Sequence, residues 1–115
     1  MEKITKKEVV RLLTENKSCM IGCCLKRNDL SIEDYFDKCK DIQIDENRLI
    51  RTAKAKGYRL VFSNDSVLDL STYVNNEYSV AEFYRDGNII LLYEMHKAGH
   101  TSNFDCEHII IYAIL

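Results

Sequence analysis

Two segments rich in aromatic and branched apolar residues, 78–84 and 89–96, flank the dipeptide Asp86-Gly87, and this pattern constrains the fold most. Asp-Gly between two such segments predicts a β-hairpin with a two-residue turn, because both central residues of that turn need a positive φ. The predicted register follows from the turn, with the cross-strand pairs Tyr84–Ile89, Phe83–Ile90, Val80–Tyr93 and Tyr78–Met95. Apolar side chains then occupy both faces of the hairpin, so both faces should be covered.

Three segments are predicted to be helices. Thr5 and Glu8 form a capping-box pattern at the start of a first helix that should end near residue 16. Ser31 is placed to cap a second helix, in which apolar residues recur at helical spacing as far as Cys39. A third helix is predicted over residues 46–56, with an N-cap at Asp45 and a stop at Gly57.

The remaining segments are predicted to be strands or loops. Short strands are expected at 19–25, 58–62 and 67–70, with a polar loop over 71–77. The chain ends on 106–115, which carries no charge from Ile109 onward and is therefore expected to be a central strand. Because helices precede strands along the chain, we expect a single α+β domain over residues 1–115, with three N-terminal helices packed on an antiparallel sheet of about five strands.

Composition places the chain among ordinary globular proteins, with 46% hydrophobic and 30% charged residues in 115. No apolar run approaches the roughly 20 residues that span a bilayer, and the first residues lack the apolar core of a signal peptide. We therefore expect a cytoplasmic protein. In that reducing compartment the five cysteines are predicted to be small apolar core residues rather than a disulfide framework.

Charge is unevenly distributed between the two halves. Residues 1–57 hold 13 Lys or Arg against 10 Asp or Glu, whereas residues 58–115 hold 3 against 8. Seven tyrosines occur in the chain, and most of them lie in the acidic half. Tyrosine gives a large contact area at low entropic cost, so an acidic, tyrosine-rich sheet surface is typical of protein binding.

The first prediction from the sequence is therefore a small non-enzymatic interaction protein. The charge pattern favours another protein as its partner, and no cofactor is expected. An inhibitor of the kind made by phages and mobile elements, which presents acidic residues to its target, would have such a surface. The predicted binding residues are Tyr73, Glu77, Tyr78, Glu82, Asp86, Glu94 and Asp105.

The alternative prediction is a nucleic-acid partner. The order of helices and strands over residues 5–70 resembles a winged helix, a DNA-binding fold whose third helix enters the major groove. The resemblance implies contacts to DNA from the basic side chains in and after the third predicted helix, which are Arg48, Arg51, Lys54, Lys56 and Arg59. The corresponding wing tip, 63–66, carries an acidic residue and no Arg or Lys.

A second alternative is a small zinc- or thiol-dependent enzyme. His96, His100, Cys106 and His108 offer four imidazole or thiolate ligands, although their spacing matches no standard zinc motif. Cys106 and His108 would lie side by side on a strand, with Asp105 or Glu107 to orient the imidazole. Three further cysteines occur at 19, 23 and 24. On a regular strand Cys19 and Cys23 share a face and Cys24 points away, so a joint metal site is not expected.

Overall fold

The computed structural model describes residues 1–26, 30–45, 47, 49, 53–97 and 104–115. Its elements follow the chain as β1 (Glu2–Ile4), α1 (Lys6–Glu15), β2 (Ser18–Lys26), α2 (Ile32–Cys39), β3 (Ala53–Lys56), β4 (Arg59–Phe62), β5 (Val67–Asp69), β6 (Ser79–Asp86), β7 (Ile89–Lys97) and β8 (Phe104–Ile114). A 3₁₀ turn at Leu70–Thr72 lies between β5 and β6.

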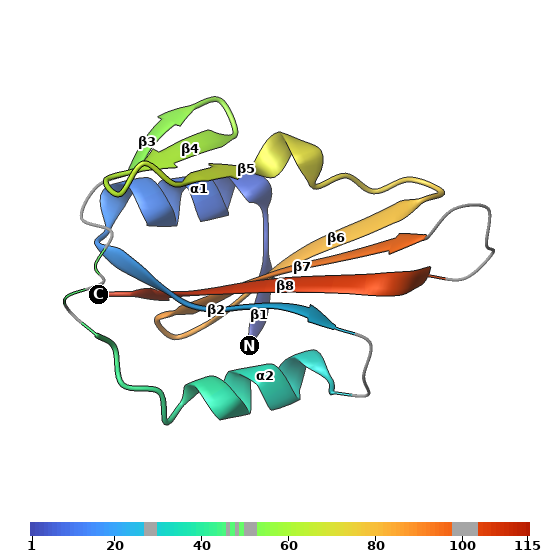
Figure 1. The fold of residues 1–115 in the computed structure, drawn as a ribbon, viewed down its shortest axis with the longest axis horizontal. Helices are drawn as coiled ribbons and strands as arrows, with labels where there is room; N and C mark the ends of the chain where they lie inside the picture. Colours follow the sequence, from blue (N-terminus) through green and yellow to red (C-terminus); the bar gives the residue numbers. More distant parts are fainter. Residues whose placement is uncertain (27–29, 46, 48, 50–52, 98–103) are drawn as a thin grey trace.

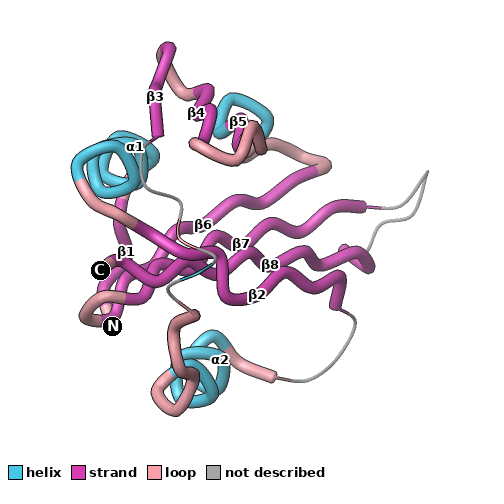
Figure 2. Tube along the Cα trace, turned by 60° about the vertical axis from the view of Figure 1, so that its left-hand side comes forward, coloured by secondary structure: helices cyan, strands magenta, loops and turns pink. Residues whose placement is uncertain are grey.

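The strands form two antiparallel sheets. The larger has the order β1-β6-β7-β8-β2 and the smaller the order β3-β4-β5. The two layers that cover the larger sheet are seen in Figure 1, where α1 and the smaller sheet lie on one side and α2 on the other. The turned view in Figure 2 shows the same arrangement. We call the two sides of the larger sheet the α1 face and the α2 face.

Alternation along β6, β7 and β8 builds a core on each face. Phe83, Ile90 and Leu92 are buried on the α1 face, against α1 and the smaller sheet. Leu91 and Ile109 are buried on the α2 face, against the aromatic side chains of α2. The prediction that both faces of the hairpin are covered is therefore confirmed. The last strand, β8, lies between β7 and β2, which also confirms its predicted central position.

The predicted arrangement of three helices on about five strands is wrong. The described residues form two α-helices and eight strands in two antiparallel sheets. Ala53–Lys56, assigned to the third helix, is a strand that pairs antiparallel with β4. Gly57 has a φ of +61° and turns the chain between these strands, so the glycine expected to end a helix begins a hairpin instead. The other residues of the predicted helix include 46, 48 and 50–52, which lie outside the described residues.

The central hairpin exists, but its predicted register is wrong. The observed pairs include Asp86–Ile89, Tyr84–Leu91 and Val80–Met95, so the turn residues are Gly87 and Asn88. Gly87 takes the positive φ, +59°, at the first central position, where a type II′ turn requires glycine. Each residue of β6 pairs with the residue two positions further along β7 than predicted. Because a shift of two residues preserves the alternation, every side chain stays on the predicted face of the hairpin.

The ends of the two helices agree with their capping residues. The Thr5 side chain accepts a hydrogen bond from the Glu8 backbone N–H at 3.2 Å. At α2, Ser31 and Asp34 form a reciprocal capping box.

Neither described helix has the length and apolar character needed to cross a membrane. The short strand β1 was not predicted, because three residues are too few to show a pattern, and it pairs with β6.

Candidate functional sites

A groove of about 330 Å³ opens on the α2 face, beside the first residues of α2. It lies at the end of the larger sheet where β6 begins and β7 ends, so the strands here extend past the body of the helix (Figure 1). Its lining is mainly apolar and includes two carboxylates and a phenol. The lining residues are Leu30, Ser31, Ile32, Val80, Glu82, Tyr93, Met95, Glu107 and Ile109.

Two phenols are bonded to the carboxylates of this groove. The Tyr93 hydroxyl donates to Glu107 Oε1 at 3.0 Å, and the Tyr84 hydroxyl donates to Glu82 Oε2. Burial, then the bond to Glu82 and the charges of Glu82 and Glu33, raise the pKa of Tyr84 to about 12. Burial, followed by the bond to Glu107, raises the pKa of Tyr93 as well. Both phenols therefore keep their protons at neutral pH and act as donors.

The groove is acidic. Glu82 and Glu107 line it, and the charge of Glu33 in the first turn of α2 reaches Tyr84 beside it. Of these three carboxylates, Glu82 forms an ion pair with a described residue. Its Oε1 lies 3.6 Å from Lys3 Nζ, and the Lys3 side chain is 64% exposed. An ion pair this exposed contributes little and is easily exchanged. We call this site the acidic groove.

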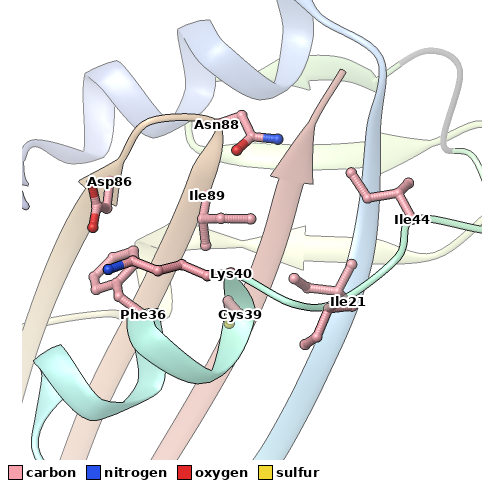
Figure 3. A pocket seen from close by; sticks show the side chains of 9 residues that line it. Ile21, Phe36, Cys39, Lys40, Ile44, Asp86, Asn88 and Ile89 are labelled. Atoms are coloured by element: carbon pink, nitrogen blue, oxygen red, sulfur yellow. The ribbon is translucent and has the colours of Figure 1, made fainter.

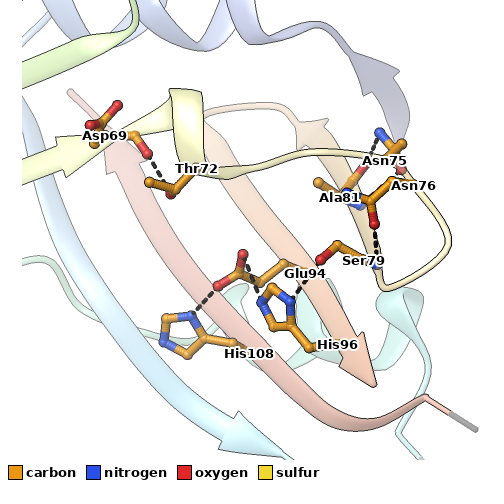
Figure 4. Close-up of polar contacts among 9 residues, drawn as sticks. All are labelled: Asp69, Thr72, Asn75, Asn76, Ser79, Ala81, Glu94, His96 and His108. Carbon is orange, nitrogen blue, oxygen red and sulfur yellow. Dashed lines mark hydrogen bonds and ion pairs between the residues drawn. The ribbon is translucent and has the colours of Figure 1, made fainter. Parts of the chain in front are cut away.

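A chain of polar contacts occupies the α1 face at the same end of the sheet (Figure 4). Cys23 Sγ lies 3.3 Å from His108 Nε2, and His108 Nδ1 lies 3.2 Å from Glu94 Oε1. The other Glu94 oxygen lies 3.2 Å from His96 Nε2. His96 Nδ1 is 3.0 Å from Ser79 Oγ. We call these five residues the Cys23–Ser79 network.

One arrangement of protons satisfies all four contacts of the network. If Glu94 is a carboxylate, each of its oxygens accepts an N–H from one imidazole. The second nitrogen of His108 then accepts the Cys23 S–H, and the second nitrogen of His96 accepts the Ser79 O–H. Each imidazole is thereby fixed in one tautomer by the carboxylate that the two share.

Regular pairing places most of the network. His108 is directly opposite Glu94 in the register of β7 and β8, and His96 opposite Ser79 in that of β6 and β7. Asn75 holds the chain that leads into β6, because its side chain both accepts from and donates to the Ala81 backbone, at 3.0 and 3.2 Å. These contacts fix the start of β6 beneath the preceding segment (Figure 4).

A β-bulge places Cys23. Met20 pairs with Tyr112 and Gly22 with Ile111, so Ile21 is an extra residue in β2. The extra residue reverses the alternation, and Cys19 and Cys23 therefore lie on opposite faces, contrary to the prediction. Cys19 is buried, whereas Cys23 is exposed beside His108. The prediction that every cysteine is a core residue is therefore wrong for Cys23.

The predicted protein-binding residues do not share one surface. Glu82 lies in the acidic groove, whereas Glu94 lies in the network on the opposite face. Tyr73 is buried against Phe83 and is only 5% exposed, so it offers no contact surface. Glu77 and Tyr78 are exposed before β6, Asp86 lies 3.9 Å from the N-terminal amine, and the Asp105 side chain lies outside the described residues.

The predicted nucleic-acid residues lie on a strand hairpin instead of a helix. Lys54, Lys56 and Arg59 are exposed, and the pairing of β3 with β4 puts them on the outer face of the smaller sheet. Arg59 also lies opposite Asp69, whose carboxyl pKa is lowered first by hydrogen bonds from Ser71 and then by the Arg59 charge. Arg48 and Arg51 lie outside the described residues.

The predicted metal ligands are partly brought together. His96 and His108 meet through Glu94, while His100 and the Cys106 side chain lie outside the described residues. No group of three or more ligating side chains suited to a metal is found in the described part of the chain. Glu107, predicted as a possible partner of His108, lines the groove on the other face, so Glu94 is the residue that orients His108.

A second hollow, of about 250 Å³, lies between the end of α2 and the β6–β7 turn (Figure 3). Its lining is about equally polar and apolar, with Ile21, Phe36 and Ile89 on the apolar side and one cation, Lys40, and one anion, Asp86, among the polar residues. Since these charges oppose each other, the hollow has no preference for a ligand of either sign.

No family model, curated protein or solved structure matches this chain.

Proposed function

We propose that this protein acts in the cytoplasm by binding a partner protein through the acidic groove. The bound segment of the partner presents a basic side chain with an apolar stem, or a basic side chain beside an apolar residue. Inhibition of the partner by covering a basic surface is the form of this function that we favour. The observation that carries the proposal is that Glu82 and Glu107 both line a mainly apolar groove, where each accepts a hydrogen bond from a phenol.

Long basic side chains match this combination. An arginine or lysine has an apolar stem that suits Val80 and Met95, and a charged head that suits the two carboxylates of the same groove. Guanidinium can also bond a carboxylate at two points and lie against a tyrosine ring. Arginine is therefore the anchor that we expect in the bound segment, with aromatic or aliphatic neighbours.

The size of the groove sets what it can hold. Its volume of about 330 Å³ is at the lower end of the roughly 300–1,000 Å³ typical of pockets for small ligands, so it accepts one or two side chains of a larger partner. Tyr78, just before β6, is 62% exposed and lies two residues from Val80 of the groove, so it is available to a partner that extends beyond the groove. Anchors in such pockets contribute most of the binding energy of an interface, about 2 kcal/mol or more each.

Selection from a peptide display library tests the proposal directly. We expect the immobilised wild-type protein to enrich peptides that combine Arg or Lys with apolar residues. The selected peptides should bind the double variant Glu82→Lys with Glu107→Lys at least about 30-fold more weakly, as expected for the loss of one or more anchors. Because charge attraction speeds encounter, raised salt should also slow their association with the wild-type protein.

The control is Glu15→Lys, which makes the same charge change as each of the two groove substitutions made singly, at an exposed position at the end of α1. It should leave binding within about threefold of wild type, since its charge is on the other side of the sheet. Peptides without basic residues, or equal binding to the double variant, would show that the acidic groove is not the site.

A further inference from the structure

We propose that Cys23 is a nucleophile that accepts an acyl group, with His108 as its general base and Glu94 as a positioning residue. The site lies on the α1 face and does not depend on the acidic groove. Its substrate class is an activated acyl compound, a thioester or an ester with a good leaving group. The three side chains come from β2, β8 and β7, which are adjacent strands.

The geometry is that of an activated thiol. A nucleophile and its base must be within hydrogen-bond reach, and the base must be oriented by a third group. Cys23 Sγ lies 3.3 Å from His108 Nε2, and Glu94 Oε1 lies 3.2 Å from the opposite nitrogen of the same ring. The carboxylate thus presents the basic nitrogen of His108 to the thiol.

Exposure separates this cysteine from Cys19 and Cys39. Cys19 and Cys39 are buried, and burial raises the pKa of the Cys39 thiol, which makes it inert. Cys23 is exposed, and the His108 side chain is 29% exposed, so an acyl compound can reach both groups from solvent. Glu94 is only 16% exposed, so it is screened from water and holds His108 more firmly.

The proposed step is balanced by one proton transfer in each direction. The Cys23 proton passes to His108 Nε2 as Sγ bonds to the carbonyl carbon. The tetrahedral intermediate then breaks its bond to the leaving group, which takes the proton from His108. Cys23 is left as a thioester. A water molecule releases the acyl group as a carboxylic acid, with His108 first accepting the water proton and then returning a proton to the Cys23 sulfur.

The test is acetylation by p-nitrophenyl acetate. The wild-type protein should release p-nitrophenolate in a burst of about one equivalent per chain, and mass spectrometry should locate the acetyl group on Cys23. Cys23→Ala should abolish the burst. The matched control Cys24→Ser, on the adjacent residue of the same strand, should retain it, because Cys24 lies on the opposite face.

Removal of the base separates catalysis from a merely structural contact. His108→Ala should slow acetylation of Cys23 by about 10²-fold or more, and added imidazole should restore part of the rate. Glu94→Gln should also slow it and change its pH profile. Circular dichroism should show all variants folded. The proposal is overturned if Cys23 is acetylated no faster than free N-acetylcysteine, if the acetyl group is on another residue, or if folded His108→Ala reacts at the wild-type rate.

Discussion

At the scale of single residues, Gly87 determines the turn of the central hairpin. Its φ is +59°, which valine avoids because of its branched side chain, although a Cβ at this position would meet no atom within 4 Å. Gly87→Val should therefore lower the free energy of unfolding by more than about 1 kcal/mol through backbone strain alone. Urea denaturation followed by circular dichroism measures this change.

Gly87→Asn is the control for that substitution. Asparagine adopts a positive φ more readily than most residues that have a side chain. The Gly87→Asn variant should therefore lose clearly less stability than Gly87→Val. Equal losses in the two variants would mean that the side chain, and not the φ of this residue, is responsible.

The position of Cys23 shows what residue patterns alone could not provide. Alternation along a regular strand put Cys19 and Cys23 on the same face, and both were predicted to be in the core. The bulge at Ile21 breaks that alternation, and it depends on how β2 pairs with β8, which lies near the other end of the chain. His96 and His108 were recognised as a possible site, but their shared partner Glu94 became evident only from the register of β7 and β8.

At the scale of elements, capping and strand signals were reliable and the third helix was not. Thr5 and Ser31 cap the two helices as predicted, because a cap is a local contact within four residues. The Ala53–Lys56 segment has residues that suit a helix, and glycine follows it. Its pairing with β4 buries Ala53 beside Leu60 and Phe62, and this tertiary contact overrides the local preference.

The loss of that helix changes the expectation for nucleic acid. Lys54, Lys56 and Arg59 are on a short exposed hairpin, and the protein carries a net charge of −2. We expect duplex DNA binding no tighter than the roughly 10⁻⁴–10⁻⁶ M of non-specific contacts at physiological salt. Changing all three residues to Ala should weaken any such binding uniformly across sequences. A gel-shift assay that gives nanomolar, salt-sensitive binding to one sequence would contradict this.

At the scale of the whole molecule, the two sites share one end of the larger sheet. The acidic groove uses the α2 face and the Cys23–Ser79 network uses the α1 face, where β6 begins and β7 ends. Helix α2 and the layer formed by α1 and the smaller sheet pack against the more apolar end of the strands. Glu94 pairs with Ala81, the residue next to Glu82, so the two carboxylates lie on opposite faces and the same sheet end carries two separate candidate sites.

Buried phenols should make the whole fold sensitive to alkali. Burial raises the pKa of Tyr112 from 10.0 to about 12, and Tyr112 is only 4% exposed and stacks on Phe62. Between these two values the unfolded chain has lost this proton while the folded chain keeps it, so folding is opposed as pH rises. Stability from this group is complete below pH 10 and should fall by up to about 1.4 kcal/mol per pH unit from there to pH 12.

Tyr112→Phe tests this linkage, because it keeps the ring and removes the ionisable hydroxyl. Urea denaturation at several values from pH 9 to pH 12 should give a shallower loss of stability in Tyr112→Phe than in wild type. Tyr78→Phe, the same change at a side chain that is 62% exposed, should leave the wild-type slope. If Tyr112→Phe keeps that slope too, alkaline unfolding is due to other groups, and the hydroxyl of Tyr112 is not held in its protonated form by the fold.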